Sequence, residues 1–576
     1  MSPKILSREP PDGNPGLLPG VDPLVARLYA NRGITRSEEI DHGLSNLLNP
    51  AGLGDFDKAT TRLAAAVETG ERILIVGDFD ADGATSVAMC VSLLKAMGAA
   101  EVEFLVPNRF EFGYGLSPEI VRVALAREPA VIVTVDNGIS SIEGVALANA
   151  HGTDVIITDH HLPGVDLPDA YAIVNPNAPD CAFESKALAG VGVAYYVLSG
   201  VRASLRGSGW FTRVGLTEPN MADWLDLVAL GTVADVVPLD RNNRVLVHHG
   251  LARMRRGRCR PGIRALVESS GRNLGELDSE DLGFSVGPRL NAAGRLDDMT
   301  LGIRCLLAAS PDEARRCAAA LNELNKARRE LEAAMVEDAR LIVAGHDEPV
   351  GGRYGVTLYD ASWHQGIIGI VAGRLRDKVN RPVIAFADAG HSAPDELKGS
   401  ARSLSELHIR DALDVIATRH PGLLLKFGGH AMAAGLSIKR VHYQRFARAF
   451  DTVVRERLPE SALTQTIETD GELEAGDLTL VNAQTVRDAG PWGQGFPPPL
   501  FHGRFDLVSQ RVVGGQHLKM AVKSGGRLFD AIAFRQAPLG APGEVGEVQL
   551  VYKLGINTYR GGQTLQLMVE YVRSIA

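Results

Sequence analysis

Short apolar runs that end in acids or histidines recur along the first half of the chain. Four of them read ILIVGDFDADG at 73–83, VIVTVDNG at 131–138, DVIITDHH at 154–161 and LVALGTVADVVPL at 227–239. The first three runs are short, rich in valine and isoleucine, and do not alternate with polar residues. They therefore predict buried parallel strands. The fourth predicts an apolar helix that ends in a short loop.

The segments between these runs alternate between helix and strand patterns from about residue 64 to 182, which predicts a doubly wound parallel sheet. A helical region is expected to follow, and the uninterrupted pattern at 311–344 predicts one long helix that joins two lobes. A smaller α/β unit is expected from about 355 to 457, with a helix over 363–378. From TQTIETDGEL at 464–473 onward, short strand-like pieces separated by glycines predict a β-barrel.

The 576 residues are too many for one hydrophobic core and favour three or four domains. The expected boundaries are a loosely packed lead-in over 1–50, an α/β domain over 51–310, the connecting helix over 311–345, a second α/β domain over 346–460 and the barrel over 461–576.

Composition narrows the class of protein. The net charge of −9 disfavours a general nucleic-acid binder. The segment Arg241–Arg260, however, has seven arginines and no acid, which indicates either a nucleic-acid contact or a solvated helix face. The five cysteines form no CxxC pair, which argues against structural zinc and disulfides. With no signal-peptide core and no membrane-length apolar run, we expect a cytoplasmic protein without a membrane partner.

The acids at the strand ends predict a metal centre, with two metals as the simplest interpretation. The carboxyl ends of parallel strands open onto one crevice, so these side chains should converge there. Acids packed close together raise each other's pKa unless a cation lies among them. If the backbone stays extended, Asp78, Asp80 and Asp82 point the same way. A mixed Asp and His set favours Mn²⁺ or Mg²⁺ over calcium. The alternative is a separate capping or turn role for each acid.

The order and spacing of these motifs carry a family resemblance. DFDADG, VDNG, DHH and GTVADVVPL are followed by FSVGPRLNAAGRLDD at 284–298, WHQGIIGIVAGRL at 363–375 and FGGHAMAAG at 427–435. Together they resemble the RecJ family of the DHH phosphoesterase superfamily, over nearly the whole chain. The resemblance implies a DHH domain, a long connecting helix, a DHHA1 domain and a C-terminal OB-like barrel.

The resemblance also implies a set of metal ligands. By position, the ligands of two Mn²⁺ or Mg²⁺ ions would be Asp80, Asp82, Asp136, His160 and Asp235. Asp136 would bridge the ions, and His161 would lie behind the ligands or touch the phosphate. Many superfamily members carry a metal-binding histidine where this chain has Val76, so Asp78 or water would take that place.

Substrate contacts are expected from other residues. Candidates for holding phosphate are Arg109, Arg289, Asn291, Arg295, Ser400, Arg402 and His430. Arg402 offers a fork-shaped donor beside the Ser400 hydroxyl, and Gly428–His430 is expected to begin a helix that approaches an anion. The alternative for each arginine is a surface ion pair. On the barrel the candidates are Arg511, His517, Lys519, Tyr559 and Arg560, with Phe529 and Phe534 expected in its core.

The resemblance implies a metal-dependent exonuclease that degrades single-stranded DNA 5′→3′ to mononucleotides, in recombination and mismatch repair. A single-stranded-DNA-binding protein and a helicase are the implied partners of a monomer. The alternatives are a DHH phosphodiesterase acting on short oligonucleotides or cyclic dinucleotides, pyrophosphatase-like chemistry, or an inactive strand-binding scaffold. The barrel favours a polymeric substrate, and the complete set of acids disfavours the scaffold.

Overall fold

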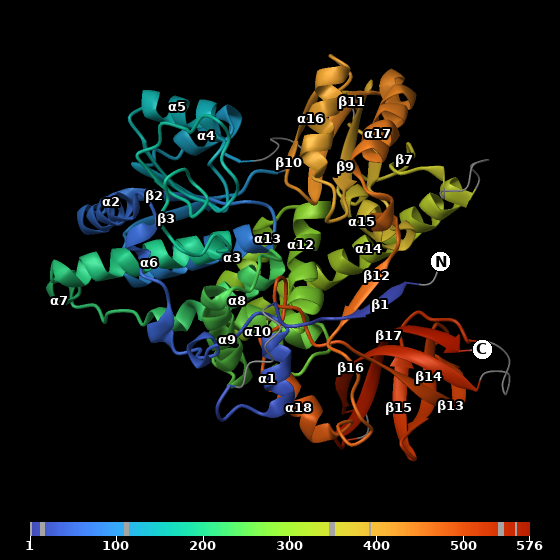
Figure 1. The fold of residues 1–576 in the computed structure, drawn as a ribbon. Coiled ribbons are helices and arrows are strands. Elements are labelled where there is room, and N and C mark those ends of the chain that lie inside the picture. Colours follow the sequence, from blue (N-terminus) through green and yellow to red (C-terminus); the bar gives the residue numbers. More distant parts are fainter. Residues whose placement is uncertain are drawn as a thin grey trace. The chain divides into compact units, whose positions relative to one another are not determined.

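The structure is a computed structural model that describes residues 3–11, 18–108, 115–344, 352–390, 393–539, 546–558 and 561–575. The chain divides into two compact units (Figure 1). The first comprises Met1–Ile5 and Glu323–Ile467, and the second comprises Leu6–Asn322 and Glu468–Ala576. In the described part of the chain, no helix is both long and apolar enough to cross a membrane.

A five-stranded parallel sheet forms the centre of the second unit, which confirms the predicted doubly wound architecture. Its order is β3-β2-β4-β5-β6. The strands are β2 (Arg72–Val76), β3 (Glu101–Leu105), β4 (Val131–Val135), β5 (Asp154–Thr158) and β6 (Ala172–Val174). Because β3 and β4 lie on opposite sides of β2, the winding reverses there. A crevice is therefore expected at the carboxyl ends of β2 and β4.

The strands are apolar because helices cover both faces of the sheet. Leu74, Ile132 and Val155 belong to one buried cluster with α4 (Pro118–Leu125) and α5 (Ile142–Ala150). Helices α3 and α6 are not part of that cluster and contact the strands separately. The remaining helices of this part are α2 (Phe56–Thr69), α3 (Ala81–Ala96), α6 (Gly190–Gly207), α7 (Trp210–Val214), α8 (Leu225–Ala234), α9 (Arg241–Arg255), α10 (Pro261–Ser269), α11 (Ser279–Asp281), α12 (Gly287–Leu296) and α13 (Thr300–Leu307).

The arginine-rich segment at α9 serves mainly the fold. The Arg244 guanidinium donates to the backbone oxygens of Leu239 and Glu39. Arg253, Arg255 and Arg260 likewise bond Asp223, the Leu277 oxygen and Asp226. Four of the seven arginines are therefore engaged inside the protein, so the structure does not support a nucleic-acid contact across this whole segment.

The predicted long helix is confirmed as α14 (Pro311–Ala344). The first unit holds a mixed sheet of order β10-β11-β9-β8-β7. Its elements are β7 (Val356–Tyr359), α15 (Ile368–Val379), β8 (Val383–Asp388), β9 (Glu396–Arg402), α16 (Ile409–Arg419), β10 (Lys426–Gly429), β11 (Ala433–Lys439) and α17 (Tyr443–Arg457). Helix α15 begins five residues later than expected, because Trp363–Gly366 forms turns closed by Asp360 and the His364 ring.

The C-terminal barrel is closed, in the order β13-β14-β15-β17-β16. Its strands are β13 (Phe501–Val513), β14 (His517–Ser524), β15 (Arg527–Ala533), β16 (Glu547–Asn557) and β17 (Thr564–Ile575), and α18 (Leu480–Asp488) precedes them. The expected first strand of the barrel is wrong, because β12 (Thr466–Thr469) pairs with β1 (Lys4–Ser7) instead. Phe529 is buried as predicted, but Phe534 is 55% exposed, so its assignment to the core is wrong.

The lead-in is packed rather than loose. Leu28 of α1 (Pro23–Ala30) is fully buried in the core of the barrel. The Arg32 guanidinium donates to both oxygens of the buried Asp470 at 2.9 and 3.0 Å, and the Tyr29 hydroxyl donates to the Ala489 oxygen. The lead-in thus contains a helix that closes one end of the barrel domain.

Candidate metal centre

The side chains that follow β2, β4, β5 and α8 converge on the expected crevice. Their possible ligand atoms lie within 4.8 Å of one another in three groups. The groups are Asp78, Asp80 and Asp136; Asp82, His160 and Asp235; and Asp136, His160 and His161. Asp136 is shared by two of these groups, so it lies between the acids of the first loop and the two histidines.

Helix α3 begins at Ala81, so the condition that the backbone stays extended over 78–82 is not met. Asp80 is the N-cap of α3, and its Oδ1 accepts a hydrogen bond from the Gly83 N–H at 3.0 Å. Asp82 lies in the first turn and is buried. Its two oxygens accept from the N–H groups of Gly190 and Val191 at 2.6 and 3.0 Å. These N–H groups begin α6, and a helix N-terminus favours a negative charge.

Asp136 has a left-handed backbone, with φ of 62°. This conformation is uncommon outside glycine, although aspartate tolerates it, and such strain is concentrated at functional sites. The next residue supports it, because the Asn137 amide donates to the Val76 oxygen at 3.1 Å and to the Val135 oxygen at 2.9 Å. The ends of β2 and β4 are thus joined directly behind the Asp136 carboxylate.

The two histidines of the DHH motif have different protonation states. Burial alone would lower the pKa of His161, but the hydrogen bond to Asp159 at 2.8 Å raises that pKa to about 9. Burial and the neighbouring His161 charge lower the pKa of His160. His160 is therefore neutral near pH 7, and its Nε2 lies 3.1 Å from Asp136 Oδ1 and 3.5 Å from Asp235 Oδ2. A neutral imidazole is the form that binds metal.

The acids of the centre resist ionisation without a cation. Burial and repulsion from Asp235 raise the pKa of Asp82 to about 7. Burial and repulsion from Asp80 raise the pKa of Asp235 to about 7. Burial, with repulsion from the neighbouring acids, also raises the pKa of Asp136. This is the electrostatic pattern of a cation site.

The donor set fits a hard divalent cation. Within the described residues, the buried His160 Nε2 and Asp235 Oδ2 make no hydrogen bond. Carboxylate oxygens with an imidazole nitrogen suit Mn²⁺ or Mg²⁺. Val76 lies in the hydrophobic core, and the Asp78 carboxylate joins Asp80 and Asp136 instead.

Metal binding is expected to strengthen with pH. Because Asp82 and Asp235 have pKa values of about 7, both must lose protons when a cation binds. The apparent Mn²⁺ affinity should rise about tenfold or more between pH 6 and pH 8. Calorimetry in two buffers of different ionisation enthalpy would measure the released protons. An affinity that is constant over this range, with no proton release, would contradict these raised pKa values.

The motif at 284–298 lies against the first loop. Arg289 is buried, and its guanidinium donates to Asn322 Oδ1 and to the backbone oxygens of Ser285 and Ser269. Asn291 Oδ1 accepts from the Ala81 N–H at 2.7 Å. Both side chains are thus engaged within the fold, and the phosphate contact expected for them stays a prediction. Arg295 is partly exposed near the end of α12.

Ser400 and Arg402 lie together in the first unit. Arg402 Nη1 donates to Ser400 Oγ at 3.1 Å, and a Cβ on Gly369 would come within 2.9 Å of both side chains. The pair therefore lies at the N-terminal turn of α15. Burial and the nearby Arg376 lower the pKa of Arg402. Arg402 Nη1 also donates to the Ala401 backbone oxygen, and no ion pair between described residues includes Arg402, so the surface ion-pair alternative does not apply to it.

His430 does not begin a helix, which corrects the expectation for Gly428–His430. Strand β10 ends at Gly429, and the exposed His430 lies in the turn to β11, where its N–H donates to the Ala433 oxygen. The glycines therefore serve a hairpin. A Cβ on Gly429 would come within 2.4 Å of the Ala433 oxygen.

Three barrel candidates share the outer face of β13 and β14. Arg511 pairs in register with Lys519, whose neighbours Leu518 and Met520 point into the core. Lys519 is bound to Asp530 at 2.7 Å, and His517 Nδ1 accepts from the Arg535 N–H. Arg511 is thus the exposed cation of the set. The other predicted contacts, Arg109, Tyr559 and Arg560, lie outside the described residues.

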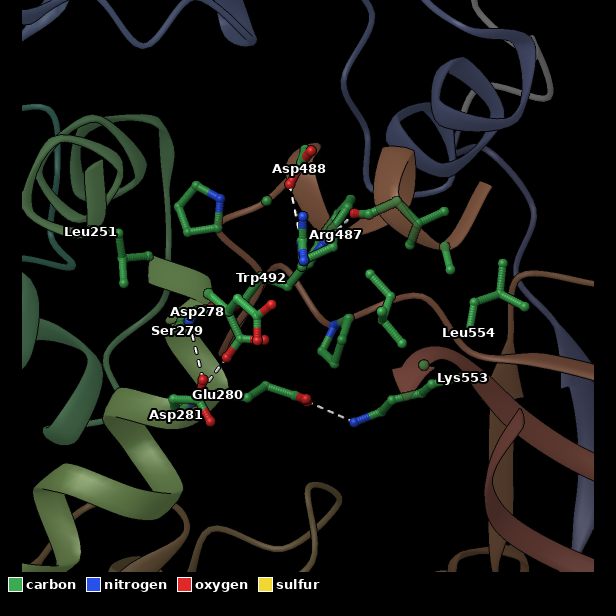
Figure 2. A pocket seen from close by; sticks show the side chains of 18 of the residues that line it. Leu251, Asp278, Ser279, Glu280, Asp281, Arg487, Asp488, Trp492, Lys553 and Leu554 are labelled. Carbon is green, nitrogen blue, oxygen red and sulfur yellow. Dashed lines mark hydrogen bonds and ion pairs between the residues drawn. The ribbon is translucent and has the colours of Figure 1, made fainter. Parts of the chain in front are cut away.

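A separate cavity of about 540 Å³ is lined by residues of α9, α11, α18 and the barrel (Figure 2). Three ion pairs join charged side chains that line it, one of them between Arg272 and Asp281 at 3.0 Å. Lys553 binds Glu280 at 2.6 Å, and Arg487 binds Asp488 at 3.1 Å. No residue of the metal cluster lines it. Unlike the acids of the metal cluster, three acids of this cavity already have an arginine or lysine as partner.

Sequence reasoning missed the residues that hold the ligands in place. Gly190 is the main one, because a Cβ there would lie 2.7 Å from Asp136 Oδ1. Asn137 is another, because its amide joins the ends of β2 and β4. Gly190 lies in ALAGVG, where small residues before an apolar helix were the sole local signal.

Comparisons with known proteins agree with this geometry. Family models match the chain as "DHH family, N-terminal domain" over 72–232, "DHHA1 domain" over 351–456 and "RecJ OB domain" over 469–571. The single-stranded-DNA-specific exonuclease RecJ of Dickeya dadantii is 52% identical over 568 residues, which cover 98% of this chain and 97% of that protein. The Escherichia coli RecJ is 49% identical over 574 residues, covering 98% of each.

The fold agrees with a solved structure. The crystal structure of Thermus thermophilus RecJ in complex with Mn²⁺ matches with a TM-score of 0.80 and 30% identity, covering 100% of this chain and 79% of that one. The same protein in complex with Mg²⁺ matches with a TM-score of 0.74 and 28% identity, covering 100% of this chain and 78% of that one. About half of the residues are identical to those of the two RecJ proteins over nearly the whole chain, and the motifs and domains agree as well. The chain therefore belongs to the RecJ family of single-stranded-DNA-specific exonucleases.

Proposed function

We propose that this chain degrades single-stranded DNA from the 5′ end to mononucleotides, using two divalent ions, Mn²⁺ or Mg²⁺. Asp80 and Asp136, helped by Asp78, would hold one ion, and Asp82, Asp136, His160 and Asp235 would hold the other. The observation that carries the proposal is that Asp136 shares one ligand group with Asp78 and Asp80 and lies 3.1 Å from His160, which shares another with Asp82 and Asp235. A bridging carboxylate is what a pair of ions needs if both are to act on one phosphate.

The protein's part in the reaction is to position the ions, which neutralise the charge of the scissile phosphate. Divalent ions bound here would lower the pKa of a water molecule and offset the charge of the scissile phosphate. The carboxylates hold the ions rather than transfer protons. His161 is protonated near pH 7 and is held by Asp159, so it would offer its remaining N–H to a phosphate oxygen. His160 stays neutral and is suited to be a ligand.

The 5′-phosphate would bind at Ser400 and Arg402. A hydroxyl, a guanidinium with no carboxylate partner among the described residues, and the N-terminal turn of α15 are suited to an anion. His430 and Arg295 are further candidates for phosphate contacts. On the barrel, Arg511 and His517 would contact the strand from the outer face. Partners would be a single-stranded-DNA-binding protein and a helicase, and the enzyme would act as a monomer in the cytoplasm.

Replacing Arg402 with alanine is expected to reduce the preference for 5′-phosphorylated over 5′-hydroxyl ends about tenfold or more, because a charge-assisted hydrogen bond is worth about 1.5–3 kcal/mol. Hydrolysis rates on matched oligonucleotides, one with a 5′-phosphate and one with a 5′-hydroxyl, would measure this preference. Arg419→Ala removes an exposed ion pair with Glu456 in the same unit and should leave the preference unchanged. An unaltered preference in Arg402→Ala would place the 5′-end contact elsewhere.

The test of the function is digestion of end-labelled single strands with either end blocked, in Mn²⁺, in Mg²⁺ and in chelator. We expect mononucleotides from strands with a free 5′ end, little product when that end is blocked, and none in chelator. A series of lengths separates the alternative: cleavage confined to di- and trinucleotides would indicate a short-oligonucleotide phosphodiesterase. Digestion from the 3′ end would contradict the proposed polarity.

A further inference from the structure

We infer that Asn291 is a positioning residue, whose amide oxygen fixes the loop carrying Asp80 and Asp82 instead of contacting DNA. The inference rests on the proposed function, since it assumes that these acids hold the metal ions. It assigns to the GPRLNAAGR segment the task of supporting the first acidic motif from a helix more than 200 residues further along the chain.

The hydrogen bond from Ala81 is the first observation. Ala81 is the first residue of α3 and is 1% exposed, so its N–H has neither an acceptor within the helix nor access to bulk water. A buried N–H of this kind needs a partner. Asp80 Oδ1 is bound to the Gly83 N–H, and Asn291 Oδ1, at 2.7 Å, accepts from Ala81. The donors at the start of α3 are thus divided between the capping acid and Asn291.

The close approach of α12 to the same loop is the second observation. A Cβ on Gly294 would lie 1.7 Å from the backbone oxygen of Phe79. Gly294 is three residues after Asn291 and so lies on the same face of α12. The helix therefore touches the loop at two successive points, Phe79 and Ala81, on either side of Asp80. Contact of this kind fixes the backbone that aims the Asp80 and Asp82 carboxylates.

An amide suits this place better than an acid. It accepts the N–H bond without adding another negative charge to a cluster of five buried or half-buried carboxylates. Without that acceptor, the Ala81 N–H would compete with the Gly83 N–H for the carboxylate of the N-cap Asp80. Asp80 would then turn toward the helix and away from the ion.

The experiment compares Asn291→Ala with Asn291→Asp, which keeps the acceptor oxygen. Mn²⁺ affinity is measured by calorimetry, and single-strand affinity is measured in chelator. We expect Asn291→Ala to weaken Mn²⁺ binding about 10- to 100-fold, as loss of a ligand's supporting bond typically does. Asn291→Asp should restore most of the affinity, and single-strand affinity in chelator should not change in either variant. Asn220→Ala is the matched control, because its side chain accepts from the Ala222 N–H at 3.2 Å at the start of a short helix that carries none of the proposed ligands.

The opposite result would overturn the inference. A DNA-contacting Asn291 would leave Mn²⁺ affinity unchanged in both variants and weaken DNA binding, more in Asn291→Asp because its carboxylate repels phosphate. Should Asn291→Ala fail to fold, Asn291→Asp alone still separates the two roles. Wild-type protein that binds Mn²⁺ but digests no DNA would refute the proposed function and leave the inference standing, because its readout is metal affinity.

Discussion

Asp136→Asn is expected to lower kcat for single-strand hydrolysis by at least about a thousandfold while the protein stays folded. The carboxylate shares a ligand group with Asp78 and Asp80 and lies 3.1 Å from His160, a ligand of the other proposed ion, so its loss should affect both positions. Charge stabilisation by metal ions is worth several kcal/mol, and each 1.36 kcal/mol is about tenfold in rate. Asparagine is preferred to alanine because it tolerates the left-handed backbone at this position.

The same substitution should stabilise the metal-free protein, with a definite dependence on pH. The folded state raises the pKa of Asp136, so between about pH 4 and the folded pKa the unfolded chain binds fewer protons than the folded chain. The free energy of unfolding therefore falls as pH rises through this window. Asparagine carries no such charge, and the variant should be more stable than wild type at pH 8 in chelator. The difference should shrink toward pH 4.

Asp226→Asn supplies the contrast. Asp226 is also buried, but its carboxylate is bound to Arg260. Its loss leaves a guanidinium unpaired, so this variant should be less stable than wild type at pH 8 and should retain kcat. Guanidinium unfolding curves in chelator, read beside single-turnover rates in Mn²⁺, measure both effects. Near-normal hydrolysis by Asp136→Asn would remove Asp136 from the metal centre altogether.

The parts of this site that the sequence predicted are those with a local signal. An apolar run of strand length followed by DNG or DHH indicates both the strand and the edge at which its acid lies, because parallel strands open at one edge. The convergence of Asp136 with His160 follows from that rule. The backbone does not stay extended over 78–82, because Asp80 is an efficient N-cap. The apolar residues after it form a helix that begins at Ala81.

The parts that could not be predicted depend on contacts between distant segments. The sequence around Gly190 and Asn291 does not indicate that these residues contact the first two acidic motifs. Gly190 lies 54 residues after Asp136 in sequence, and Asn291 lies 210 residues after Ala81. Lys519 shows the same limit for a charged residue. A lysine on the barrel suggests a DNA contact, but its ammonium group is bound to Asp530 at 2.7 Å. Charge in a sequence does not reveal its partner.

Gly190→Ala is expected to lower kcat/KM about a hundredfold or more, although Gly190 offers no chemical group of its own. A Cβ at this position would lie 2.6 Å from Asp136 Cβ and 2.8 Å from Asp136 Cα. Neither atom belongs to the flexible end of a side chain, so the start of α6 must move away. That movement would lengthen the hydrogen bonds that Gly190 and Val191 donate to Asp82. A displacement of about 1 Å near reacting groups can cost about a hundredfold in rate.

Gly207→Ala is the matched control, because it changes the last residue of the same helix. No atom lies within 4 Å of a Cβ built there. Alanine in a helix should stabilise the protein by about 0.5–1 kcal/mol and leave the rate unchanged. Gly190→Ala should instead lose about 1–3 kcal/mol from overpacking and bind Mn²⁺ more weakly. If both variants keep wild-type rates and Mn²⁺ affinity, the close contact between α6 and Asp136 does not fix the positions of the two metal ions.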